Sequence, residues 1–187
     1  MRRSITLQYN SPVVLSFALV SLGALLLGFL TGGASTRLVF SVYRSSLADP
    51  LTYPRFILHV LGHSSFSHYL GNVMLMLVVG PPLEEKYGSR SLLWAIALTA
   101  LVSGLVQWLF FPHSALLGAS GIVFMMIVMS SLAGMKDGHI PITLLLVLAL
   151  YIGREIVDGV VLSDNVSQLT HVIGGACGAL LGMSMRK

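Results

Sequence analysis

A serine flanked by glycines opens one of the apolar runs of the sequence, in the segment Gly118-Ala119-Ser120-Gly121. Glycine lets the backbone bend and lets other groups approach it closely. The first turn of a helix leaves N–H groups without internal partners and carries partial positive charge, which would favour a nucleophile and an oxyanion. Serine is also a common helix N-cap. The segment alone therefore favours a helix cap, and a catalytic interpretation depends on the rest of the chain.

Histidines are the other residues that could do chemistry. His59 and His63 are spaced to bind zinc from one face of a helix. No glutamate follows His59 as in the zinc-protease signature, and no acidic third ligand is near, so the sequence disfavours a metal site. His113 and His139 are interpreted as ordinary loop residues.

The elements that must position these residues are membrane helices. The chain has 187 residues, of which 55% are hydrophobic and only 10% are charged, whereas soluble domains have about 25% charged residues. Its apolar runs have lengths that suit a bilayer, so we expect an all-α polytopic membrane protein with six transmembrane helices in a single membrane domain, residues 1–187. The spans are predicted at roughly 12–30, 66–83, 92–111, 120–134, 140–153 and 170–185.

Two segments outside the spans are long. Residues 33–65 mix arginines with aromatic and leucine side chains, as a segment lying on the membrane surface would, and residues 153–168 are polar. No cluster of basic residues interleaved with aromatics indicates nucleic-acid binding. The single cysteine, Cys177, excludes an internal disulfide, and its glycine-rich surroundings favour a packing role over a reactive thiol. The run at 12–30 is too long for a signal-peptide core, so we interpret it as a retained helix.

Basic residues set the predicted orientation. With the N-terminus in the cytoplasm, seven basic residues fall inside and four outside, which favours both termini in the cytoplasm. The inner residues are Arg2, Arg3, Lys86, Arg90, Lys136, Arg186 and Lys187, and the outer ones are Arg37, Arg44, Arg55 and Arg154.

The second, fourth and sixth spans descend in the same direction and carry polar residues at matching depth. Ser120, His171 and His68 each lie 15 or 16 residues before the charged residue that ends their span. At about 1.5 Å per residue all three lie roughly 23 Å above the cytoplasmic boundary, within a hydrocarbon core of about 30 Å. Asn72 shares the helix face of His68. Polar groups at this depth are costly unless satisfied or hydrated, so we expect them to surround a cavity open to the outside.

Glycines in the last span offer a means of bringing these residues together. Gly174, Gly178 and Gly182 recur every four residues below His171. Small residues at this spacing let two helices pack backbone to backbone. If the partner is the fourth span, His171 comes within hydrogen-bond reach of Ser120. The alternative is a generic packing seam with His171 at its capped end, and the matching depth of Ser120 favours the first interpretation.

In their order and spacing, these residues resemble the rhomboid intramembrane serine proteases over nearly the whole chain. Each motif is weak alone, but their match to the span boundaries makes the joint signal strong. The resemblance is to the minimal six-helix bacterial form, which implies a rhomboid-like bundle in the cell (inner) membrane. The motifs are His59-x3-His63-x4-His68-x3-Asn72, Glu85-Lys86-Tyr87-Gly88-Ser89, Gly118-Ala119-Ser120-Gly121 and His171-x2-Gly174-x3-Gly178.

The resemblance implies a role for each matching residue. Ser120 corresponds to the nucleophile and His171 to the general base. His68 and Asn72 correspond to the side-chain donors to the oxyanion, helped by the backbone N–H of Ser120. Phe124 takes the place of the aromatic residue, usually tyrosine, on which the histidine stacks, and it keeps the ring without the hydroxyl.

One part of the family pattern is incomplete. The Trp-Arg pair that often precedes the first histidine of the second-span motif reads Pro54-Arg55 here, so the arginine matches and the tryptophan does not. Anchoring of the long external segment is expected to be weaker for that reason. The short fifth span and the segment 153–168 correspond to the family's gate and lid.

The implied function is cleavage of transmembrane helices of other membrane proteins near the outer side of the bilayer. No metal or other cofactor is implied, and the expected partners are transmembrane substrates and the lipid bilayer, with no nucleic acid. The alternative is a rhomboid-like protein that binds membrane helices without cutting them, although such relatives typically lack the serine or the histidine. A transporter or channel would show internal repeats and acidic residues within its spans. The sequence does not indicate an oligomeric state.

Overall fold

The computed structural model describes residues 9–134 and 165–185, together with residues 142, 145, 146, 149 and 153. The fifth predicted span, at 140–153, falls almost entirely outside these residues. So do His139 and the candidate lid up to residue 164.

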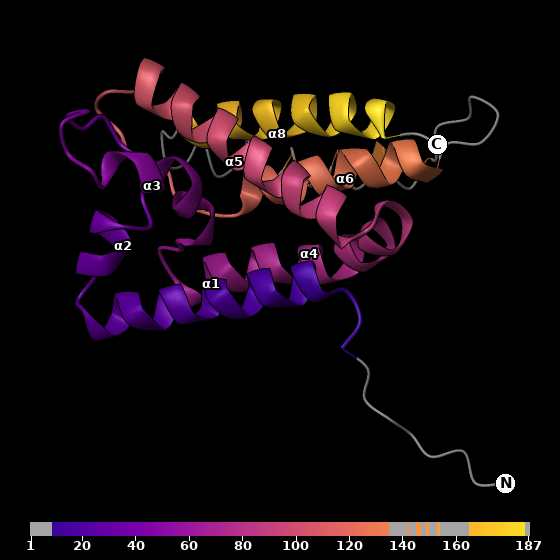
Figure 1. Ribbon diagram of the computed structural model, residues 1–187, viewed down its shortest axis with the longest axis horizontal. Helices are drawn as coiled ribbons and strands as arrows, with labels where there is room; N and C mark the ends of the chain where they lie inside the picture. The colour runs from indigo at the N-terminus through magenta and orange to yellow at the C-terminus, as the bar shows by residue number, and fades with distance from the viewer. Residues whose placement is uncertain are drawn as a thin grey trace, which may run out of the picture.

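Within the described residues the chain is all-α, and its helices are joined by loops (Figure 1). A short extended pairing between Val42 and Leu116 connects two of those loops. The helices are α1 (Pro12–Leu30), α2 (Ala34–Leu38), α3 (Thr52–Leu58), the 3-10 turn η1 (His59–Leu61), α4 (Phe66–Tyr87), α5 (Ser89–Phe110), α6 (Ser120–Gly134) and α8 (Asn165–Ser184).

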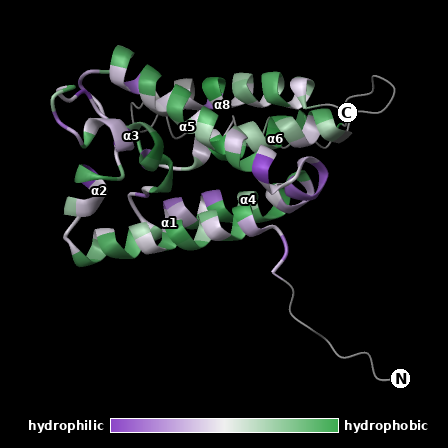
Figure 2. Ribbon diagram, in the orientation of Figure 1, coloured by the Kyte–Doolittle hydropathy of each residue, from purple (hydrophilic) through white to green (hydrophobic). Residues whose placement is uncertain are grey.

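The long helices have the length and composition of membrane spans. Helices α1, α4 and α5 are long and apolar enough to cross a bilayer, and α6 and α8 contribute shorter apolar helices at Ser120–Ala133 and Thr170–Ser184. Hydrophobic residues cover much of these helices (Figure 2), and the outward side chains of Leu30 and Trp94 are 85% and 66% exposed. Large apolar surfaces of this kind are stable in contact with lipid and unstable in water. The chain is therefore a multi-pass membrane protein.

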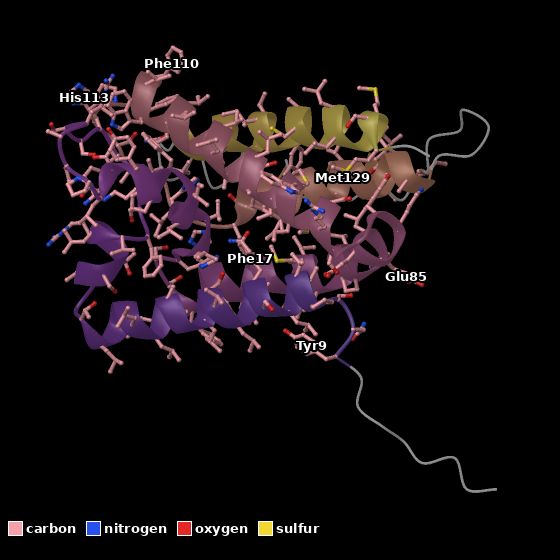
Figure 3. All side chains as sticks on the ribbon, viewed as in Figure 1. Tyr9, Phe17, Glu85, Phe110, His113 and Met129 are labelled. Atoms are coloured by element: carbon pink, nitrogen blue, oxygen red, sulfur yellow. The ribbon has the colours of Figure 1, made fainter. Side chains whose placement is uncertain are left out.

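Helix α6 lies at the centre of the bundle, packed against α4, α5 and α8. An apolar helix that is buried on every side needs protein partners all round, which explains why α6 is apolar without an amphipathic stripe. Met129 lies among the helices in Figure 3. Five side chains of α6 are at most 1% exposed, namely Ile122, Val123, Met125, Met126 and Met129.

The two ends of the bundle differ. The short helices α2 and α3 and the loops lie at one end, where Phe110 and His113 are found, and Glu85 marks the opposite end (Figure 3). Helices α4 and α6 both begin at the loop end and run toward the other end (Figure 1). The first residues of these two helices therefore lie close to the loops.

Helix α4 continues to Tyr87, beyond the end of its apolar run. Glu84 is only 4% exposed, and its carboxylate accepts the N–H groups of Val13 (2.9 Å) and Val14 (3.1 Å) and the hydroxyl of Ser89 (2.7 Å). These N–H groups belong to the first turn of α1 and have no partner within their own helix. Glu84 thus ties the start of α1 to the end of α4, and the charged residue lies inside the fold.

Two further boundaries differ from the sequence prediction. Helix α5 begins at Ser89 and ends at Phe110, whereas the span was expected at 92–111. Helix α8 begins at Asn165, whereas the sixth span was expected from about residue 170. Both differences have the same cause, because an apolar run marks only the part of a helix that suits lipid, while the helix itself needs only backbone hydrogen bonds.

Candidate active site

The start of α6 is held by the loop that precedes it. Leu116 exchanges two backbone hydrogen bonds with Val42, both of 2.9 Å, and the N–H of Gly118 donates to the carbonyl of His59 at 2.9 Å. These bonds connect the loop to Val42, between α2 and α3, on one side and to η1 on the other. Ser120 begins α6 directly afterwards and is half-buried. Its position is therefore set by long-range backbone bonds and by the buried helix that follows.

His68 and Asn72 lie against the backbone just before Ser120. A Cβ atom placed on Gly118 would lie 2.8 Å from both Cε1 and Nε2 of His68 and 4.0 Å from Nδ2 of Asn72. Gly118 also has a φ of 120°, which side chains rarely adopt. The glycine therefore serves two purposes, because it allows the turn into α6 and leaves room for the two polar side chains.

Helix α8 packs on α6 along its glycines, in the close approach that the sequence predicts. A Cβ atom on Gly174 would fall on the backbone carbonyl of Gly121, and one on Gly178 would lie 2.5 Å from the carbonyl oxygen of Met125. Thr170 lies across from Gly121 as well, since a Cβ on that glycine would be 2.9 Å from the Thr170 methyl group. The residue after Ser120 thus contacts the residue before His171.

His171 is buried, at 5% exposed, and its ring lies beside the ring of Phe124. The ring centroids are 5.9 Å apart and the planes make an angle of 58°, so the contact is tilted and not face to face. Phe124 occupies the space left by Gly175, whose Cβ would lie 2.8 Å from the Phe124 ring. The aromatic residue that the family resemblance assigns to the histidine is therefore next to it.

Together these contacts bring the predicted site residues to one region of the bundle. His68 and Asn72 adjoin the turn before Ser120, and Phe124 adjoins His171. A cavity of about 470 Å³ borders the same loop, lined by Ala115 and Leu117 together with residues of α1, α2 and the external segment. A direct bond between the Ser120 hydroxyl and the His171 imidazole is part of the function proposed below.

The structure also contains a serine–histidine pair that the sequence analysis did not predict. His59 Nε2 lies 3.3 Å from the hydroxyl of Ser103 on α5, and His59 Nδ1 lies 3.1 Å from the carbonyl of Arg55. The Ser103 hydroxyl oxygen also lies 2.8 Å from the carbonyl oxygen of Thr99 and 3.0 Å from that of Ala100, both on its own helix. The only signal in the sequence was a serine within the apolar span 92–111, which needs a partner at that depth.

This second pair has a poor setting for catalysis. His59 is 1% exposed and Ser103 is 3% exposed, so a substrate would have no access. Burial lowers the pKa of His59 to about 4, which keeps the ring neutral near pH 7. Both ring nitrogens are engaged, so neither is available to a metal ion. The pair instead holds η1 against α5, and η1 in turn holds Gly118.

His63 is similarly enclosed, at 2% exposed. Its Nδ1 lies 3.2 Å from the carbonyl of Leu61, and its ring meets the rings of His68 (centroids 5.0 Å apart) and Tyr69 (5.5 Å) edge-on. Burial, and to a smaller extent the neighbouring His68, lower the pKa of His63 to about 4. The described part of the chain contains no cluster of three or more metal-ligating side chains. His63 is therefore a neutral packing partner of His68.

Trp108 of α5 anchors the segment 33–65, in which Pro54 stands where the family pattern often has tryptophan. Its indole N–H donates to the carbonyl of Ser45 at 3.1 Å, and the guanidinium of Arg44 lies 4.3 Å from its ring centroid. Arg55 is 2% exposed, donates to the carbonyl of Leu38 at 2.7 Å and pairs with Asp49 at 3.0 Å. The segment is therefore fixed from α5, which a comparison of short motifs could not reveal.

A multi-pass membrane protein with this arrangement of glycines, histidines and a helix-start serine can be compared with known families. The rhomboid domain family matches residues 50–187, and the chain belongs to this family. It is 31% identical over 141 residues to rhomboid-related protein 1 of Caenorhabditis elegans, which is 68% of this chain and 38% of the relative.

Two other relatives match over more of the chain. Rhomboid protease GlpG of Pectobacterium atrosepticum is 29% identical over 181 residues, covering 93% of this chain and 63% of the relative. Rhomboid-like protein 15 of Arabidopsis thaliana is 28% identical over 188 residues, covering 92% of this chain and 46% of the relative. The chain thus spans less than two thirds of the length of each of these relatives.

Proposed function

We propose that this protein is an intramembrane serine endopeptidase that uses Ser120 as nucleophile and His171 as general base to cut transmembrane helices near the outer side of the bilayer. One observation carries the proposal most strongly. Helix α8 approaches α6 so closely that Gly174 meets the backbone of Gly121. Gly121 directly follows Ser120, and Gly174 lies about one helical turn after His171. Membership of the rhomboid family supports it, because one relative is itself named a protease.

The reaction follows from the residues around Ser120. His171 accepts the hydroxyl proton as the Ser120 oxygen attacks the carbonyl carbon of the scissile peptide bond. The tetrahedral intermediate collapses when His171 returns that proton to the leaving amine, which leaves an acyl group on Ser120. Water, deprotonated by the same imidazole, then attacks the acyl carbon, and His171 returns that proton to the Ser120 oxygen as the acid product leaves. No cofactor takes part in these steps.

The developing oxyanion would be stabilised by His68, Asn72 and the N–H of Ser120. The two side chains adjoin Gly118, and the start of α6 adds its partial positive charge. Asn72 Nδ2 donates to the carbonyl of His68 at 3.2 Å, which leaves its second hydrogen for the oxyanion. A single donor of this kind contributes about 3–4 kcal/mol to transition-state stabilisation.

The surrounding architecture completes the proposal. We place six transmembrane helices in one domain, residues 1–187, with both termini in the cytoplasm and the loop end of the bundle facing outward. The family implies membrane proteins as substrates. A segment of a substrate helix would have to unwind before it enters the site, so small or helix-breaking residues near the cut would favour cleavage.

A reconstituted cleavage assay with a transmembrane substrate tests this function. The wild type should cut, and Ser120→Ala and His171→Ala should each lose activity by at least about 10³-fold. Undiminished cleavage by Ser120→Ala would contradict the assignment. If the wild type binds the substrate helix but does not cut it, the protein is a non-catalytic binder. Loss of cleavage in a folded Ser103→Ala variant alone would point to the His59–Ser103 pair.

A further inference from the structure

Two consecutive serines before α4 contact the same histidine in different ways. The hydroxyl of Ser65 accepts the backbone N–H of His68 at 3.1 Å, which is an ordinary helix N-cap. The hydroxyl of Ser64 lies 3.1 Å from the ring atom Nδ1 of His68. The helix start is satisfied by Ser65, so the contact of Ser64 with the ring has no role in capping.

The ring contact matters because a neutral imidazole carries one N–H on either of two nitrogens. The edge of His68 that contains Nε2 and Cε1 faces Gly118, two residues before Ser120. With the proton on Nε2, this edge presents a donor to the region where the oxyanion would form. With the proton on Nδ1, it presents a lone pair, which would repel a negative oxygen. Only the first tautomer can support the proposed reaction.

A serine hydroxyl can rotate to donate its proton or to accept one. When Ser64 donates to Nδ1, that nitrogen must hold the lone pair and the proton must be on Nε2. The ring is also limited in its rotation, because His63 lies edge-on to it with the centroids 5.0 Å apart and the planes at 71°. Contacts at Nδ1, along the ring edge and at Gly118 together define one orientation of the ring.

We propose that Ser64 is a positioning residue that donates its hydroxyl proton to His68 Nδ1 and thereby holds His68 as an Nε2–H donor for the oxyanion. This inference rests on the proposed function for its catalytic consequence. The hydrogen bond itself is independent of that function, since it is a property of the resting protein. The same logic applies to metal-bound and catalytic histidines in general, where the partner of one ring nitrogen determines the state of the other.

Ring-nitrogen NMR tests the proposal directly. Protein labelled with ¹⁵N-histidine is measured in bicelles near neutral pH, and the His68 signals are assigned by their loss in His68→Gln. In the wild type, the shifts should show Nε2 protonated and Nδ1 unprotonated. Ser64→Ala should move both shifts toward a mixture of tautomers, and Ser64→Thr, which keeps a hydroxyl, should restore them.

Activity gives a second readout in the same variants. Ser64→Ala should lower kcat about fivefold with little change in KM, which is the effect expected for one hydrogen bond acting on the transition state. Ser64→Thr should recover most of the loss. A purely structural role of Ser64 would change the yield or the thermal stability and would leave the His68 shifts in place.

Ser65→Ala is the matched control, because it removes a neighbouring hydroxyl that contacts the backbone of the same residue. It should lower the unfolding temperature and leave the tautomer of His68 unchanged. Wild-type shifts in Ser64→Ala, or a lower kcat that Ser64→Thr does not recover, would overturn the proposal. If Ser120→Ala still cuts, the proposed function fails, while the NMR comparison still decides whether Ser64 sets the tautomer.

Discussion

The bundle contains a buried serine and histidine in hydrogen-bond contact, Ser103 and His59, and a second serine and histidine, Ser120 and His171, on two helices that meet where Gly121 contacts Thr170. Ser103 lies within α5, has its hydroxyl close to carbonyls of its own helix and is 3% exposed. Ser120 lies at the start of α6 and is half-buried. Gly118 lies two residues before it and Gly121 directly follows it. The two pairs therefore differ in setting: the first is enclosed by the bundle, whereas Ser120 lies at a helix start, is partly exposed and has His68 and Asn72 beside the preceding turn.

The largest expected effect is a difference in cleavage activity between the Ser120 and Ser103 variants. Ser120→Ala should reduce cleavage by at least about 10³-fold while the protein remains folded. Ser103→Ala should retain cleavage within about tenfold when rates are compared per folded molecule. Gel-based cleavage of a reconstituted substrate, with circular dichroism as a control for folding, measures both. Equal losses in the two variants would mean that cleavage depends on Ser103 as much as on Ser120.

The next effect concerns the glycine contact that brings α8 to α6. Gly174→Ala places a methyl group on the carbonyl of Gly121, so α8 must move away. We expect a loss of about 1–3 kcal/mol in stability from overpacking and of about 10²-fold in cleavage from the displaced imidazole. Gly23→Ala in α1 is the matched control, because a Cβ there meets nothing within 4 Å. An active Gly174→Ala variant would show that the approach of the helices is not required.

Ser103 should matter for stability. Its removal leaves Nε2 of the buried His59 without its hydroxyl partner, which should cost about 1–3 kcal/mol. Ser131→Ala is a suitable control, since that serine also donates to a carbonyl one turn earlier, Ile127, but has no histidine partner among the described contacts. Chemical unfolding in mixed micelles compares the two. A larger loss in Ser131→Ala would argue against a structural role for the His59–Ser103 bond.

The smallest effect is a pH dependence of stability, to which both His59 and His63 contribute because burial lowers the pKa of each to about 4. Burial lowers the pKa of His59 to about 4, whereas an unfolded histidine has a pKa of about 6.5. Between these values the unfolded chain binds more protons, so stability is complete above about pH 6.5 and falls as the pH falls toward 4. At pH 5 the loss should be about 1–2 kcal/mol for His59.

Thermal unfolding at pH 7 and pH 5 measures this loss. His59→Gln should reduce the difference between the two pH values, whereas His113→Gln, at an exposed loop position, should not. A wild-type protein that is equally stable at both values would contradict the proposed neutral state of His59.

The sequence predicts the parts of this structure that depend on local pattern. An apolar run predicts α1 at residues 12–30, the glycine segment predicts a helix start at Ser120, and the spacing of Gly174, Gly178 and Gly182 predicts a close helix contact. Each of these signals lies within a few turns of the chain. Matching depth suggests that Ser120 and His171 lie close together, their roles are those that the resemblance to the rhomboid family implies, and both stay predictions until cleavage is measured.

Several features that the sequence did not predict join distant residues. The Glu84 carboxylate binds N–H groups about seventy positions earlier, at Val13 and Val14, so it could not be distinguished from a residue that merely ends a span. Trp108 donates to the carbonyl of Ser45 across 63 positions, and His59 meets Ser103 across 44 positions. Such contacts depend on how the helices pack, and one sequence contains no local sign of them.

The shortness of α6 has a consequence for how this protein responds to its bilayer. With 15 residues the helix is only about 22 Å long, less than the roughly 30 Å of a hydrocarbon core. No described side chain of α6 is in the fully exposed class, whereas α1, α4, α5 and α8 all carry exposed apolar side chains, so hydrophobic mismatch acts mainly on those four helices and reaches α6 through them. The depth of Ser120 in the membrane is therefore set by the helices around α6. A thicker or thinner membrane will shift that depth by tilting those helices.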